Sequence, residues 1–232
     1  MEYLCIIILS IIMILVTIIV FKINMKQIIA ISKNEKLNEI AEKYPSNTEI
    51  CKKILKILKN EGVKIEKTEN SDTTLYIAIT NKISIANNQT NFTRIQTMAH
   101  ECLHSIQPRR LLIFNFIYTN IYLIFYAVSL ILIVFKIANE KHQVIFLLAI
   151  FLILSFLYYV VRIYLENDAM FKAKYLAKEY MESENISDKD EIYEVIQGYE
   201  QANSLSIKTT NVQFFVQILI KVIIFSLLAL IF

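Results

Sequence analysis

The sequence predicts a mainly helical, polytopic membrane protein with about four transmembrane helices and a small α+β portion in the cytoplasm. Three observations predict this class. Of the 232 residues, 56% are hydrophobic and only 19% are charged. Glycine and proline, which interrupt helices, occur twice each. The apolar residues also form four long runs, each close to the ~20 residues that a helix needs to cross a bilayer.

The four apolar runs, at 4–21, 111–135, 144–161 and 212–232, divide the chain into alternating apolar and polar segments. We expect the two longer polar segments to build one functional unit. The predicted segments are a transmembrane anchor at 1–22, a cytoplasmic segment at 23–110, a transmembrane hairpin at 111–163, a cytoplasmic helical segment at 164–211 and a transmembrane helix at 212–232.

Lysine and arginine residues indicate the orientation in the membrane. No basic residue precedes the first run, whereas Lys22, Lys26 and Lys33 follow it. Arg109 stands just before the second run, and Arg162 closes the third. Because basic residues favour the cytoplasmic side, we predict a multi-pass protein of the cell (inner) membrane with both ends outside and the polar segments in the cytoplasm.

The first polar segment has the pattern of a helix followed by strands. Ser46-x-x-Glu49 has the spacing of a capping box and predicts a helix that ends near Gly62. Residues rich in strand formers follow, which predicts two strands at 74–80 and 83–86 with a turn at 81–82.

Three further helices are expected from the positions of breakers and caps. They run from Thr90 to Gln107 before Pro108, from the third apolar run to about Met181, and from the capping pattern Ser187-x-x-Asp190 to about Asn203.

The stretch His100-Glu101-Cys102-Leu103-His104 is an HExxH sequence on the first of these helices. Residues four apart lie on one face of a helix, so both imidazoles can reach one metal ion. Glu101 is rotated by about 100° and can instead act as general base on a zinc-activated water. This pattern predicts a Zn²⁺-dependent metalloendopeptidase with His100 and His104 as metal ligands and Glu101 as the catalytic residue.

A catalytic zinc ion needs a third protein ligand, and carboxylates are the candidates. His142 falls in a loop that the predicted topology places on the far side of the bilayer. Glu166 lies just past the third run, at the same membrane depth as the two histidines, and is our candidate. Ala169 shares its helix face, which would allow a close approach. Asp168 could orient a ligand histidine or be solvated.

At these residues the chain resembles the neutral zinc metallopeptidases of bacterial membranes, the YugP type. That family's HEvGHaiQ pattern corresponds to residues 100–107, and its E-F-D-A segment corresponds to residues 166–169. The resemblance implies a zincin-like cytoplasmic portion, with His100, His104 and Glu166 as zinc ligands and Glu101 as the catalytic acid/base. Leu103 replaces the family's glycine.

Two other function classes stay open. One is a catalytically silent membrane scaffold of the same fold. The other is a transport component, suggested by the polar stripe of Gln213, Gln217 and Lys221 on the last run. Intramembrane proteolysis is disfavoured because the residues before the motif are polar. A strand at 73–79 could hold an extended peptide.

The expected partners are a peptide or protein substrate, which could itself be a membrane protein, and the lipid bilayer. Nucleic acid is excluded because the net charge of +3 is spread out and no basic stripe is present. The sequence leaves the oligomeric state open.

Overall fold

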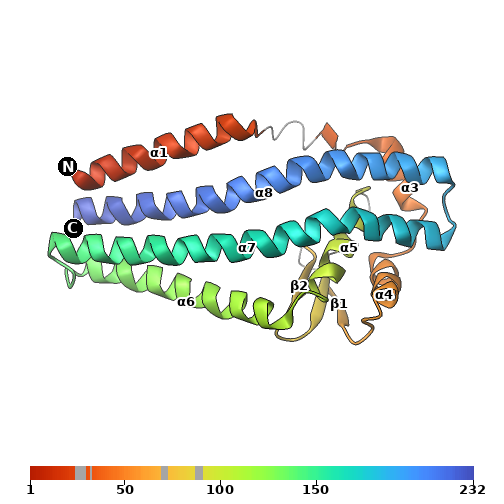
Figure 1. Cartoon of the computed structure of the whole chain (residues 1–232), viewed down its shortest axis with the longest axis horizontal. Helices are drawn as coiled ribbons and strands as arrows, with labels where there is room; N and C mark the ends of the chain where they lie inside the picture. The colour runs from red at the N-terminus through yellow and green to blue at the C-terminus, as the bar shows by residue number, and fades with distance from the viewer. Residues whose placement is uncertain (24–29, 32, 69–72, 87–90) are drawn as a thin grey trace. The chain divides into compact units, whose positions relative to one another are not determined.

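The structure is a computed structural model that describes residues 1–23, 30–31, 33–68, 73–86 and 91–232. These residues contain seven α-helices and one three-stranded sheet, so the protein is mainly helical, as predicted (Figure 1). The chain divides into two compact units. The helical unit comprises Met1–Ile23, Phe114–Tyr164 and Lys208–Phe232, and the mixed unit comprises Asn24–Ile113 and Leu165–Ile207.

Four helices of the described residues are long and apolar enough to cross a membrane, judged by length and composition. This finding agrees with the four apolar runs. Helices α7 and α8 have 44 and 43 residues, more than the ~20 that a bilayer requires, so each continues beyond its apolar part. The four are α1 (Glu2–Phe21), α6 (Arg109–Val134), α7 (Lys141–Glu184) and α8 (Lys189–Ile231).

Aromatic side chains form the core of the helical unit. Tyr122, Phe151 and Phe225, from α6, α7 and α8, are fully buried. The ring centroids are 5.5 Å apart for Tyr122 and Phe151, and 6.4 Å apart for Phe151 and Phe225. Lys221 Nζ lies 5.0 Å from the ring centroid of Tyr122, which is cation–π distance. The polar stripe of the last run thus includes a lysine packed on an aromatic core.

The sheet of the mixed unit has the order β1-β3-β2, so β2 lies at an edge. Strand β1 (Lys64–Thr68) pairs parallel to β3 (Lys82–Ala86), and β2 (Leu75–Ile77) pairs antiparallel to β3. The predicted strand 74–80 is therefore too long. The turn begins at 78, and Asn81 ends it with a positive φ of 48°. Asparagine tolerates this left-handed conformation better than most residues.

Helices α3 (Glu35–Glu42), α4 (Asn47–Ile57) and α5 (Arg94–His104) share one hydrophobic core with the polar parts of α7 and α8. Buried Cys51 and Cys102 show how closely α4 and α5 pack, because their Sγ atoms are 3.6 Å apart. Gly198 on α8 allows a similar approach, since a Cβ atom there would lie 2.5 Å from Leu37 Cδ1.

Three predicted helix ends are wrong. Ser46 is the N-cap residue of α4, as predicted, but it makes no side-chain cap hydrogen bond, so the predicted capping box does not form. Helix α4 ends at Ile57 instead of near Gly62. Asp188 Oδ1 accepts a 2.8 Å hydrogen bond from the Glu191 N–H, so the cap lies one residue after Ser187. Helix α8 also runs on to Ile231 instead of ending near Asn203, because no glycine or proline follows Asn203 to interrupt it.

Buried Arg94, the first residue of α5, positions this helix. Its guanidinium donates 2.8 Å hydrogen bonds to Asn47 Oδ1 and to the Ala41 carbonyl, and another hydrogen bond to the Pro45 carbonyl. The Ala41 carbonyl lies in the last turn of α3 and the Pro45 carbonyl between α3 and α4, so Arg94 fixes α5 to the end of α3 and the turn that follows it. Thr90, the expected start of α5, lies outside the described residues.

Candidate metal centre

Helix α5 presents His100 and His104 on the same face, as their spacing predicts. Their Nε2 atoms are 3.0 Å apart and their ring centroids 4.6 Å apart. The opposite face of the helix carries Ala99, Cys102 and Leu103, all buried in the core of the mixed unit. Leu103 occupies the position of a glycine in the family that the chain resembles, and here it is a core residue.

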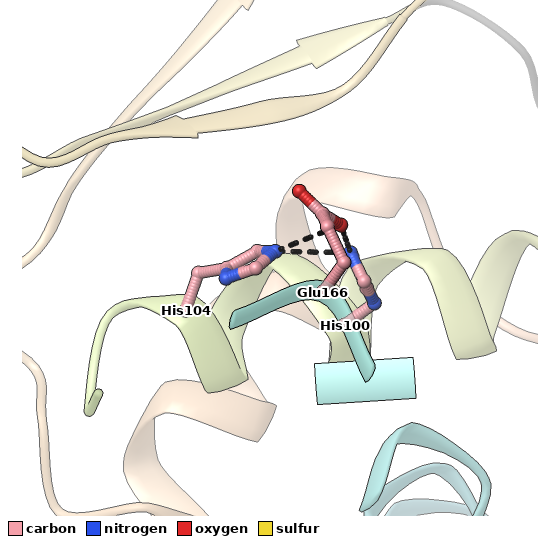
Figure 2. A group of neighbouring side chains, drawn as sticks. All are labelled: His100, His104 and Glu166. Carbon is pink, nitrogen blue, oxygen red and sulfur yellow. Dashed lines mark hydrogen bonds and ion pairs between the residues drawn. The ribbon is translucent and has the colours of Figure 1, made fainter. Parts of the chain in front are cut away.

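The side chain of Glu166, on α7, points toward the imidazoles of His100 and His104, as Figure 2 shows. Its Oε2 atom lies 3.4 Å from His100 Nε2 and 3.6 Å from His104 Nε2. These three residues form a cluster that could hold a metal ion, with ligand atoms all within 4.8 Å of one another. Small side chains let α7 bring Glu166 close to the two histidines, because the residues on its core-facing side include the buried Ala169 and Ala173.

The three ligand atoms fit a zinc ion. Ligand atoms about 2.1 Å from a tetrahedral zinc ion lie about 3.4 Å from each other. The separations of 3.0, 3.4 and 3.6 Å between the ligand atoms are close to the edge lengths of one face of such a tetrahedron. Two imidazoles and one carboxylate are also a common ligand set for catalytic zinc, with a fourth position left for water or substrate.

Glu101 lies beside the cluster and outside the ligand triangle. Its Oε1 atom is 4.0 Å from His100 Nε2. Its Oε2 atom accepts a 2.6 Å hydrogen bond from the backbone N–H of Tyr76, on the edge strand β2. Burial raises the pKa of Glu101, although the nearby charges of His100 and His104 oppose the shift. A higher pKa suits a general base that works near neutral pH.

His104 has a second partner that sequence reasoning missed. Its Nδ1 atom lies 2.8 Å from Gln107 Oε1. Gln107 Nε2 donates to the Leu165 carbonyl at 2.8 Å and to Asp168 Oδ2 at 3.1 Å. Two roles were left open for Asp168, a contact with a ligand histidine or a solvated side chain. Among the described residues its link to His104 is indirect, since Gln107 lies between them. Two signals were available in the sequence: Gln107 stands three residues after His104, and it matches the last residue of the family's HEvGHaiQ pattern.

The pKa of His104 reflects opposing influences. Burial would lower it, whereas the hydrogen bond with Glu166 and the charges of Glu101 and Glu166 raise it, and the net shift is upward. Protons and a metal ion therefore compete for this imidazole more strongly than for a solvated histidine.

A small pocket opens beside His100, with a volume of about 190 Å³. This volume is below the ~300–1,000 Å³ of typical small-molecule sites and suits a single side chain. Apart from His100, its walls are uncharged, and they include Thr93, Thr97, Ala202 and Ser206.

His142 was expected in a loop, but it lies in the first turn of α7. Its side chain is exposed, and its Nδ1 atom lies 3.0 Å from Glu140 Oε2. It belongs to the helical unit and takes no part in the cluster.

Comparison with known protein families gives a match. A family model described as "Putative neutral zinc metallopeptidase" matches residues 6–229, which is nearly the whole chain. No curated protein and no solved structure matches the sequence.

Proposed function

The chain belongs to the family described as putative neutral zinc metallopeptidases, and we propose that it is a membrane-anchored zinc metalloendopeptidase. The observation that carries this proposal is the convergence of His100, His104 and Glu166, with the carboxylate of Glu101 alongside. Two distant parts of the sequence supply the three ligand atoms, and their separations match those around zinc.

Each residue has a role in the proposed reaction. When bound, zinc would polarise the peptide carbonyl and acidify the attacking water. Glu101 would take the proton from that water and pass it to the leaving amine. Its Oε1 atom is the one to do so, because Oε2 is already engaged by the Tyr76 N–H. That hydrogen bond would hold the carboxylate in one orientation throughout the reaction.

The surroundings of the cluster favour an extended peptide as substrate. Strand β2 is an edge strand, and the hydrogen bond from the Tyr76 N–H to Glu101 places this edge next to the proposed catalytic carboxylate. We propose that a peptide lies along this edge, with one uncharged side chain in the pocket beside His100. A protein substrate would offer such a segment from a loop or an unfolded terminus.

We further propose that the four apolar helices cross the cell (inner) membrane and that the metal centre faces the cytoplasm. Substrates would then be cytoplasmic segments, including those of other membrane proteins.

Metal analysis of purified variants tests the proposal. Wild-type protein is expected to bind close to one zinc ion per chain, and Glu166→Ala to lower the zinc affinity by at least ~10-fold. Glu101→Gln should keep the zinc and cleave a mixture of proteome-derived peptides about 10²–10⁴ times more slowly. Zinc binding that survives Glu166→Ala unchanged would remove the third ligand, and undiminished cleavage by Glu101→Gln would contradict the mechanism.

The same variants separate the two other function classes. A silent scaffold predicts that Glu101→Gln changes no cellular phenotype, whereas the buried, hydrogen-bonded Glu101 carboxylate favours a catalytic role. A transport component predicts loss of function in Lys221→Leu. A peptidase predicts function after Lys221→Leu and loss after His100→Ala.

A further inference from the structure

We infer that Gln107 is a positioning residue that fixes His104 in the tautomer needed for metal binding, and that Asp168 and the Leu165 carbonyl in turn fix Gln107. This inference deepens the proposed function, because it concerns how one ligand of the same centre is held. It assigns Asp168 an indirect role, through the amide of Gln107.

The orientation of the Gln107 amide follows from its partners. Its two nearest partners on α7 are the Leu165 carbonyl, at 2.8 Å, and Asp168 Oδ2, at 3.1 Å. A carbonyl oxygen only accepts hydrogen bonds, as does an ionised carboxylate. The NH₂ group of Gln107 must therefore face α7, and its Oε1 atom must face His104.

The tautomer of His104 follows from the same logic. Gln107 Oε1 lies 2.8 Å from His104 Nδ1 and can only accept a hydrogen bond, so Nδ1 must carry the proton. A neutral imidazole has one N–H group, and Nε2 is therefore left with its lone pair. That atom is the one lying 3.0 Å from His100 Nε2 and 3.6 Å from Glu166 Oε2, at the metal-binding position.

Gln107 also joins the two helices that supply the ligands. It follows the last turn of α5, which carries both histidines, and it hydrogen-bonds residues on either side of Glu166 on α7. Its side chain is buried, so water competes weakly for these bonds. Loss of the side chain should loosen both the ring of His104 and the spacing between the ligands.

Nitrogen NMR of histidine-labelled protein tests this inference directly. The chain has three histidines, so His100→Ala and His142→Ala variants assign the signals. In wild-type protein at pH ~9, where imidazoles are neutral, we expect His104 to be protonated at Nδ1 with or without zinc. This measurement on the metal-free protein needs neither zinc binding nor catalysis, so it remains decisive if the proposed function fails.

Gln107→Ala is expected to give a mixture of His104 tautomers and a 10–100-fold weaker zinc affinity. Asp168→Asn should have a smaller effect, because an asparagine carbonyl can still accept from Gln107. The matched control is Gln96→Ala, which removes another buried glutamine of the same region whose side chain bonds Asn203 instead of a histidine. Protonation of His104 at Nε2 in wild-type protein would overturn the inference, as would equal tautomer ratios in Gln107→Ala and Gln96→Ala.

Discussion

Glu101 shows how a residue suited to catalysis affects stability. The residue is only 8% exposed, and its carboxylate accepts one backbone hydrogen bond from Tyr76. Burial disfavours the charged form, which raises the pKa in the folded protein above the ordinary value of 4.5. The folded state thus holds this proton more tightly than the unfolded state does. Above the ordinary pKa, this difference destabilises the metal-free protein, and the destabilisation grows as the pH rises toward the folded-state pKa.

We therefore predict that Glu101→Gln raises the thermal unfolding midpoint of the metal-free protein at pH 8. The gain should shrink as the pH falls through 4.5, because below that pH the wild-type carboxyl is protonated in both states. Circular dichroism in detergent with a chelator measures both midpoints. The control is Glu179→Gln, a substitution at an exposed position of α7 that should not change the unfolding midpoint at either pH. A gain that is equally large at pH 5 and pH 8 would contradict the explanation.

Some residues of the candidate metal centre could be predicted from the sequence and others could not, for a physical reason. His100, His104 and Glu101 are separated by helical spacing, so one turn of α5 places them. Glu166 required the further assumption that the chain returns to the same side of the bilayer. Tyr76 acts through its backbone N–H, and Gln107 through a particular side-chain conformation. Residue type and spacing do not encode either contact.

At the scale of elements, α7 brings Glu166 to the histidines through a face of small residues. Ala169 is fully buried in the shared core, and Ala173 is 1% exposed. A larger side chain at Ala169 would need space that the close-packed core does not provide.

We predict that Ala169→Leu destabilises the protein by about 1–3 kcal/mol and weakens zinc binding by 10-fold or more. Overpacking should push α7 away from its neighbours and enlarge the distances between Glu166 and the two imidazoles. Thermal unfolding and zinc titration measure the two effects. Glu179→Leu adds the same side chain at an exposed position of α7 and should change zinc affinity little. Wild-type zinc affinity in Ala169→Leu would show that this close approach is not required.

Element boundaries were the weakest part of the sequence prediction. Helix α8 was expected as two pieces because its residues change from polar to apolar near Val212. The helix continues through that change in polarity. Helix formation depends on local propensity and on helix-breaking residues, and no glycine or proline lies between Asn203 and Val212. The strand at 74–80 was overestimated because strand-forming residues also occupy the turn that precedes Asn81.

At the scale of the whole molecule, the cluster of His100, His104 and Glu166 limits how the chain can cross a membrane. His104 and Glu166 meet in space, yet the segment between them contains α6 and the apolar part of α7. If these helices cross the bilayer, they must do so an even number of times, and two crossings meet this condition. The charge distribution, with its basic residues after 1–22 and around the hairpin, favours the same arrangement.

A pair of crossings between the ligands predicts which positions a membrane-impermeant thiol reagent can reach in intact cells. In a variant with its three cysteines replaced, Asn139→Cys, between α6 and α7, should be labelled. Glu61→Cys and Glu179→Cys, both exposed in the mixed unit, should be labelled only after the membrane is permeabilised. Retained zinc binding would show that each variant is folded. Labelling of Glu61→Cys and Glu179→Cys in intact cells would place the metal centre outside, and opposite behaviour of these two positions would exclude a pair of crossings between the ligands.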